Sequence, residues 1–110
     1  MSLINRHAFA RARLIEDLAG AAAKWGYEVP EDPGVTELAD GLAQALDRLQ
    51  ADPDGHVEAA SHLGTAVEHL KAVARLGGLL PLVVGHHLRR ALQHEQSACL
   101  KVGQSARPTT

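Results

Sequence analysis

Three short segments rich in proline, glycine and aspartate divide this chain into four longer ones, and they restrict its fold more than any other feature. The breaks are residues 26–34, 52–55 and 77–81. Proline lacks the backbone N–H that a helix needs, adjacent glycines favour helix ends, and Asp-Pro-Asp-Gly is typical of a chain reversal. We therefore expect the four intervening segments to form separate elements.

The intervening segments have the composition and spacing of amphipathic helices. Their apolar residues recur at steps of three and four, which places them on one side of a helix. Alanine and leucine dominate and only three residues are aromatic, a mixture that favours helix over sheet. Asp32 and Pro33 have the residue types of a helix N-cap and first position. We predict helices at residues 3–25 and 33–51, a third that ends at Gly77, and a fourth from Pro81 to about Val102.

A chain of 110 residues can bury one hydrophobic core but not two. We predict an all-α fold with a single helical domain at residues 1–102. This domain is a four-helix antiparallel bundle, or a dimer in which paired helical hairpins complete a bundle. The polar residues 103–110 are expected to form a disordered tail. One alternative stays open, in which the third and fourth helices form a single kinked rod.

Charge is distributed unevenly along the chain. Residues 28–58 contain nine acidic residues and one basic residue, although the whole chain has a formal net charge of −2. The acidic second helix can pair with basic neighbours inside the bundle, or it can dock on a basic surface of a partner. The basic residues form no clear single face, which argues against nucleic-acid binding.

The start of the fourth helix has more apolar surface than one face of a helix can hold. The residues concerned are Leu79, Leu80, Leu82, Val83 and Val84. They fall at successive angles around the helix and need cover on several sides. The loop at residues 26–34 can supply this cover through Tyr27 and Val29. Otherwise the five residues form a protein interface, for a partner or for a second copy of the chain.

Four of the seven histidines are regularly spaced. His62 and His69 are seven residues apart, as are His87 and His94. If the chain reverses near residue 78, His69 lies level with His87 and His62 with His94. All four lie at the border of the apolar faces, where a shared metal or haem would require both borders to meet. We expect solvated or packed histidines with no metal and no other cofactor; a pH-dependent interface is the remaining option.

One short segment resembles a known family. His-Leu-Lys at residues 69–71, followed by Leu-Gly-Gly at residues 76–78, is similar to the histidine, lysine and leucine-glycine signature of histidine phosphotransfer domains, which are also helical bundles. The resemblance implies that His69 would be the phosphorylated residue. The chain departs from the signature because its histidine and lysine are one residue closer together. Val73 also stands where the family has a small residue.

The sequence contains no arrangement typical of catalysis, since neither Ser97 nor Cys99 has an assigned base. A single cysteine cannot form an internal disulfide, which suits a cytoplasmic protein. The longest apolar run, residues 76–85, is far shorter than the roughly 20 residues that span a bilayer, so no membrane association is expected. We predict a small, non-enzymatic, bacterial-type regulator, inhibitor, anti-activator or adaptor that binds another protein and forms a dimer. The alternative is a histidine phosphotransfer-like or metal- or haem-binding bundle.

Overall fold

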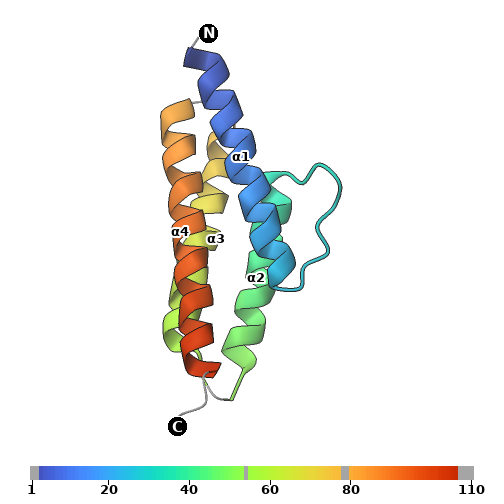
Figure 1. Cartoon of the computed structure of the whole chain (residues 1–110), viewed down its shortest axis with the longest axis vertical. Coiled ribbons are helices and arrows are strands. Elements are labelled where there is room, and N and C mark those ends of the chain that lie inside the picture. Colours follow the sequence, from blue (N-terminus) through green and yellow to red (C-terminus); the bar gives the residue numbers. More distant parts are fainter. Residues whose placement is uncertain (1–2, 54, 78–79, 107–110) are drawn as a thin grey trace.

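A computed structural model describes residues 3–53, 55–77 and 80–106, which form four helices and their connections. The helices are α1 (Leu3–Lys24), α2 (Val35–Ala51), α3 (Val57–Leu76) and α4 (Pro81–Ala106). They lie side by side in an elongated bundle (Figure 1) with principal extents of 54 × 24 × 22 Å. For this part of the chain the all-α prediction is confirmed. None of these helices is both long and apolar enough to cross a membrane.

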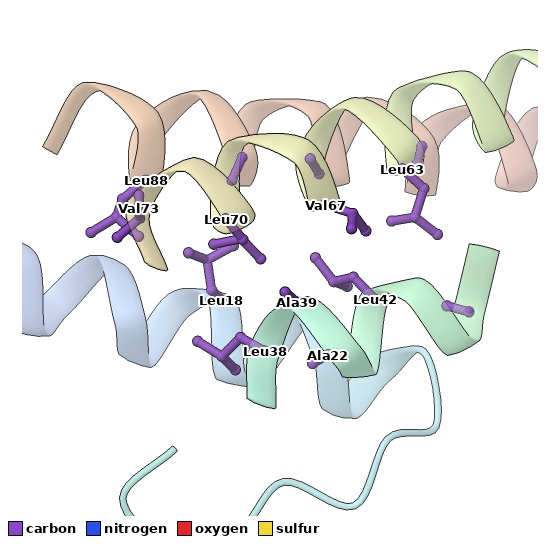
Figure 2. Close-up of a cluster of buried hydrophobic side chains, with 14 of the residues drawn as sticks. Leu18, Ala22, Leu38, Ala39, Leu42, Leu63, Val67, Leu70, Val73 and Leu88 are labelled. Carbon is purple, nitrogen blue, oxygen red and sulfur yellow. The ribbon is translucent and has the colours of Figure 1, made fainter. Parts of the chain in front are cut away.

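Each helix packs against two neighbours. α1 packs against α2 and α4, and α3 packs against the same two helices, so α2 and α4 occupy opposite corners of the bundle. Side chains from all four helices meet in one apolar core, part of which Figure 2 shows. Its largest fully buried members are Leu18, Leu38, Leu42, Leu63, Leu70, Val73, Val84 and Leu88. Because burying a leucine or valine side chain contributes about 1.5–3 kcal/mol, this core determines which face of each helix points inward.

The direction of α1 differs from the antiparallel prediction. α2, α3 and α4 alternate in direction, whereas α1 runs the same way as both of its neighbours, α2 and α4 (Figures 1 and 2). The connection at residues 25–34 makes this possible, because ten extended residues can span roughly 30 Å and return the chain to the level of the middle of α1. The other two connections are too short for such a return.

The connection between α1 and α2 lies against α2. The ring of Tyr27 fills the space beside Gly41, so closely that a Cβ atom on this glycine would lie 2.6 Å from the ring. The guanidinium of Arg48 on α2 donates a hydrogen bond to the carbonyl of Trp25. These contacts tie the connection to the corner of the bundle opposite α4.

α3 and α4 form a hairpin, so the alternative of a single kinked rod is wrong. α3 ends at Leu76, and Gly77 has a φ of 61°, a conformation that glycine adopts without strain. The backbone N–H of Gly77 donates to the carbonyl of Val73 over 3.0 Å. α4 then begins at Pro81, as predicted, because proline fits the first position of a helix.

Two predicted boundaries need correction. α2 begins at Val35 and not at Pro33, because Asp32 has a φ of 54° and therefore lacks the extended conformation of an N-cap. Gly34 is the N-cap, and its carbonyl accepts the N–H of Leu38 over 3.1 Å. α4 continues to Ala106, beyond the predicted end at Val102, so the first residues of the predicted tail are helical. Residues 107–110 of that tail lie outside the described residues.

Candidate functional site

The start of α4 presents an exposed apolar surface. Leu80, Leu82 and Val83 are 59%, 69% and 40% exposed, and we call these three residues the α4 apolar surface. Val84, which the sequence analysis also placed in the interface, is 1% exposed and belongs to the core. The prediction for Val84 is therefore wrong. This residue lies on the inner face of α4, which points toward α1 and α3. Leu79, the fifth predicted interface residue, lies outside the described residues.

The alternative in which residues 26–34 cover this surface through Tyr27 is wrong. Tyr27 packs on Gly41 of α2, at the corner of the bundle diagonally opposite α4. Leu82 and Val83 therefore keep their exposure. The excess of apolar residues that the sequence shows at this point is left facing solvent.

Leu80 has an unusual backbone conformation in addition to its exposure. Its φ is 53°, in the left-handed region that glycine and asparagine favour. This conformation costs a residue with a side chain about 1–2 kcal/mol. The chain thus holds a large apolar side chain in solvent at a strained position, where glycine would be more stable.

Basic side chains border the α4 apolar surface. The guanidinium of Arg89 reaches back along α4 to Gly85, where a Cβ atom would lie 3.5 Å from its Nη1. This places the positive charge about one helical turn from Leu82. Arg75 is exposed in the last turn of α3, beside the hairpin connection. The first turn of α4 contains no acidic residue.

The acidic charge lies at the opposite corner. Glu37, Asp40 and Asp47 are exposed on α2. The ion pairs among the described residues are His56–Asp52, Lys71–Glu68 and Lys101–Glu58. None of these ion pairs involves Glu37, Asp40 or Asp47.

A column of histidines continues from the α4 apolar surface along the seam between α3 and α4. We call His62, His69, His87 and His94 the histidine ladder. The Nδ1 atoms are 2.8 Å apart in the pair His69–His87 and 3.1 Å apart in the pair His62–His94. The rings of His69 and His94 stack with centroids 5.8 Å apart. The predicted levels of both pairs are therefore confirmed, and the borders of the two apolar faces do meet.

The hydrogen bonds that link Arg90, His94 and His62 require both imidazoles to be neutral. Nη2 of Arg90 lies 3.2 Å from Nε2 of His94, and a guanidinium can only donate, so this Nε2 must accept. A neutral His94 then carries its proton on Nδ1 and donates it to Nδ1 of His62. Arg90 is thus a donor, His94 accepts one hydrogen bond and donates another, and His62 is an acceptor.

The surroundings of His69 and His94 also oppose protonation of these two histidines. Burial lowers the pKa of His69 below its ordinary value of 6.5, and the charges of His87, His94, Arg90 and His86 lower it further. Burial also lowers the pKa of His94, with additional contributions from Arg90 and His62. These neighbours are all cationic or able to become so. The neutral forms of His69 and His94 are therefore favoured.

The ladder does not assemble the usual donor set of a metal site. Among the residues that the structure describes, no three histidine, cysteine or carboxylate side chains converge as ligands. Structural zinc sites use four protein ligands and catalytic sites use three, whereas the ladder brings its nitrogens together in pairs. His69, the residue singled out by the phosphotransfer resemblance, is half-buried and directs Nδ1 at His87.

Sequence reasoning missed a polar group inside the core. Glu95 is 3% exposed, and its Oε2 accepts hydrogen bonds from Nε1 of Trp25 over 3.0 Å and from Sγ of Cys99 over 2.9 Å. Burial and the neighbouring Glu95 carboxylate raise the pKa of Cys99 to about 12, which makes this thiol a poor nucleophile. The spacing of Glu95 from the buried Ala91 and Ala98 was the available signal, because it places the carboxylate on the inner face of the helix.

Comparisons of the chain with protein-family models, curated proteins and solved structures find no match. Two sites stand out in the fold. The α4 apolar surface is exposed at the start of α4, and the histidine ladder pairs four imidazoles between α3 and α4.

Proposed function

We propose that this protein is a small non-enzymatic regulator that binds another protein through the α4 apolar surface. The observation that carries the proposal is the exposure of Leu80, Leu82 and Val83 together at one end of the bundle. Adjacent exposed leucine and valine side chains on a small protein are typical of an interaction site, because covering them removes apolar area from water.

The charge around this surface indicates the chemistry of the partner. Arg75 and Arg89 are exposed beside it, whereas the acidic residues of α2 lie at the opposite corner of the bundle. Charges that border an interface speed association when the partner carries the opposite sign. The partner we propose has an apolar groove or ridge bordered by carboxylates. A second copy of this chain would place arginines beside arginines, which disfavours a symmetric dimer through this surface.

The strain at Leu80 supports the same proposal. Strained backbone conformations at non-glycine residues cluster at functional sites, and Leu80 adopts one. An exposed leucine contributes little to the stability of the isolated chain. Its retention at this position is explained if the side chain is buried in a complex.

Exchange of Leu82 for glutamate tests the proposal. Leu82 is the second residue of α4, where a carboxylate interacts favourably with the helix dipole, so Leu82→Glu is expected to fold normally. The matched control is Leu100→Glu, since Leu100 is 66% exposed on the same helix but far from its start. Tagged wild-type protein and both variants are used to capture binding proteins from the native cell, followed by mass spectrometry.

We expect a partner that wild type and Leu100→Glu retain and that Leu82→Glu loses. Equal recovery by all three proteins would contradict the proposal. Light scattering of the purified wild type addresses the predicted dimer separately. A dimer that Leu82→Glu dissociates would replace the external partner with a second copy of the chain.

A further inference from the structure

We propose that the histidine ladder is an acid-sensitive latch between α3 and α4, which joins the two helices when its imidazoles are neutral and weakens when they are protonated. This proposal does not depend on the proposed binding function. It stands on the geometry of four half-buried imidazoles that contact one another across the seam.

A single added proton disrupts the chain of hydrogen bonds that runs from Arg90 through His94 to His62. If His94 is protonated, its Nε2 carries a hydrogen and can no longer accept from Arg90. If His62 is protonated on Nδ1, this atom and Nδ1 of a neutral His94 both carry hydrogens across 3.1 Å. Neither protonated state keeps both hydrogen bonds.

The pair His69–His87 responds differently but reaches the same result. Its two Nδ1 atoms, 2.8 Å apart, can share one hydrogen. The first proton taken up by this pair lies beside the stacked ring of His94 and near Arg90 and His86, which are the groups that already lower the pKa of His69. A second proton would place two imidazolium rings in direct contact. Positive charge therefore accumulates on both sides of the seam.

Among the described residues, the carboxylates of α3 and α4 already have partners, and the one that acts on the ladder is Glu58, whose charge interacts with His62 as well as with Lys101. Glu58 and Glu68 on α3 are paired with Lys101 and Lys71, and Glu95 on α4 is turned toward Trp25 of the α1 side. α2 packs on the other side of α3, and α1 on the other side of α4. Within the described part of the chain, the charged groups that act on His69 and His94 belong to α3 and α4.

The direction of the pH effect follows from the difference between the folded and unfolded chains. An unfolded histidine takes up a proton near pH 6.5, whereas His69 and His94 in the folded chain resist it. The unfolded state thus binds more protons as the pH falls through this value, and acid shifts the equilibrium toward unfolding. Full stability is present above about pH 6.5 and decreases below it.

Thermal unfolding at two pH values tests the latch. For the wild type we expect the Tm to fall by roughly 4 °C or more between about pH 7.5 and about pH 5.5. The ion pair of Glu58 does not contribute in this window, because the hydrogen bond and charge of Lys101 hold the Glu58 pKa below its ordinary value of 4.5. The double variant His69→Gln/His94→Gln cannot be protonated at these positions. Its Tm should therefore fall much less than the wild-type Tm between the two pH values.

His56→Gln is the matched control, because His56 lies at the start of α3 and pairs with Asp52, away from the ladder. It should retain the wild-type fall in Tm. A wild-type Tm that is equal at both pH values, or a fall of the same size in the double variant, would overturn the proposal. If the double variant does not fold, NMR titration of wild-type histidines decides: His69 and His94 should titrate below 6.5, and titration at or above this value overturns the latch.

Discussion

Gly41 shows how one residue determines the path of a whole connection. It is buried on α2, and the Tyr27 ring occupies the place where any larger residue would put its Cβ atom. Because the ring can lie flat against the helix at this point, residues 25–34 can follow α2 instead of crossing the bundle. The sequence gives no local sign of this contact, since a glycine within a helical pattern is ordinarily only a weak helix former.

Replacing Gly41 with alanine should therefore be destabilising. The new Cβ would lie 2.6 Å from the Tyr27 ring, and the displaced ring should lower the free energy of unfolding by about 1–3 kcal/mol. Gly20→Ala is the control, because Gly20 is exposed in α1 and has no atom within 4 Å of the corresponding position. Alanine there should raise the stability by up to about 1 kcal/mol. Urea unfolding measures both changes, and a stabilised Gly41→Ala would show that Tyr27 does not pack as described.

Much of each helix could be predicted from its own sequence, and the limits of that prediction have physical causes. The spacing of His62, His69, His87 and His94, together with the Gly-Gly break, was sufficient to predict which pairs lie level. The start of α2 was predicted too early because Asp32-Pro33 is a good local cap, but the local signal cannot show that Asp32 adopts a positive φ.

Relations between helices were harder to predict than the helices themselves. The parallel direction of α1 depends on the packing of Tyr27 on α2, which is a contact between segments distant in sequence. Among the predicted interface residues, spacing alone did not separate the buried Val84 from the exposed Leu82, because all five were treated as one apolar group. Tertiary contacts decide both questions.

α1 and α4 are joined by a buried polar contact as well as by apolar packing. Trp25→Phe removes the indole donor and leaves Glu95 with the Cys99 thiol as a weak donor. A buried carboxylate that loses a hydrogen bond is costly, so the free energy of unfolding should fall by about 1–3 kcal/mol. Denaturant unfolding of the single variant measures this loss.

The double variant Trp25→Phe/Glu95→Leu provides the control for this prediction. It replaces donor and acceptor with apolar groups, and it should recover part of the stability that Trp25→Phe loses. Glu95→Leu alone completes the comparison: if the losses of the two single variants simply add in the double variant, the carboxylate contributes through contacts other than the Trp25 hydrogen bond.

The distribution of charge over the whole bundle predicts which side faces a partner. α2 is acidic and α4 begins with basic neighbours, and the two helices lie at opposite corners. Arg89→Glu should therefore weaken binding several-fold and reduce its dependence on salt, because this guanidinium borders the α4 apolar surface.

Asp47→Lys changes the charge by the same amount in the opposite sense on α2, and it should leave partner affinity unchanged or raise it slightly through the net charge. Titration of the partner that Leu82→Glu fails to capture, at low and high salt, measures both effects. If Asp47→Lys weakens binding more than Arg89→Glu does, the docking face is the acidic corner of the bundle, opposite α4.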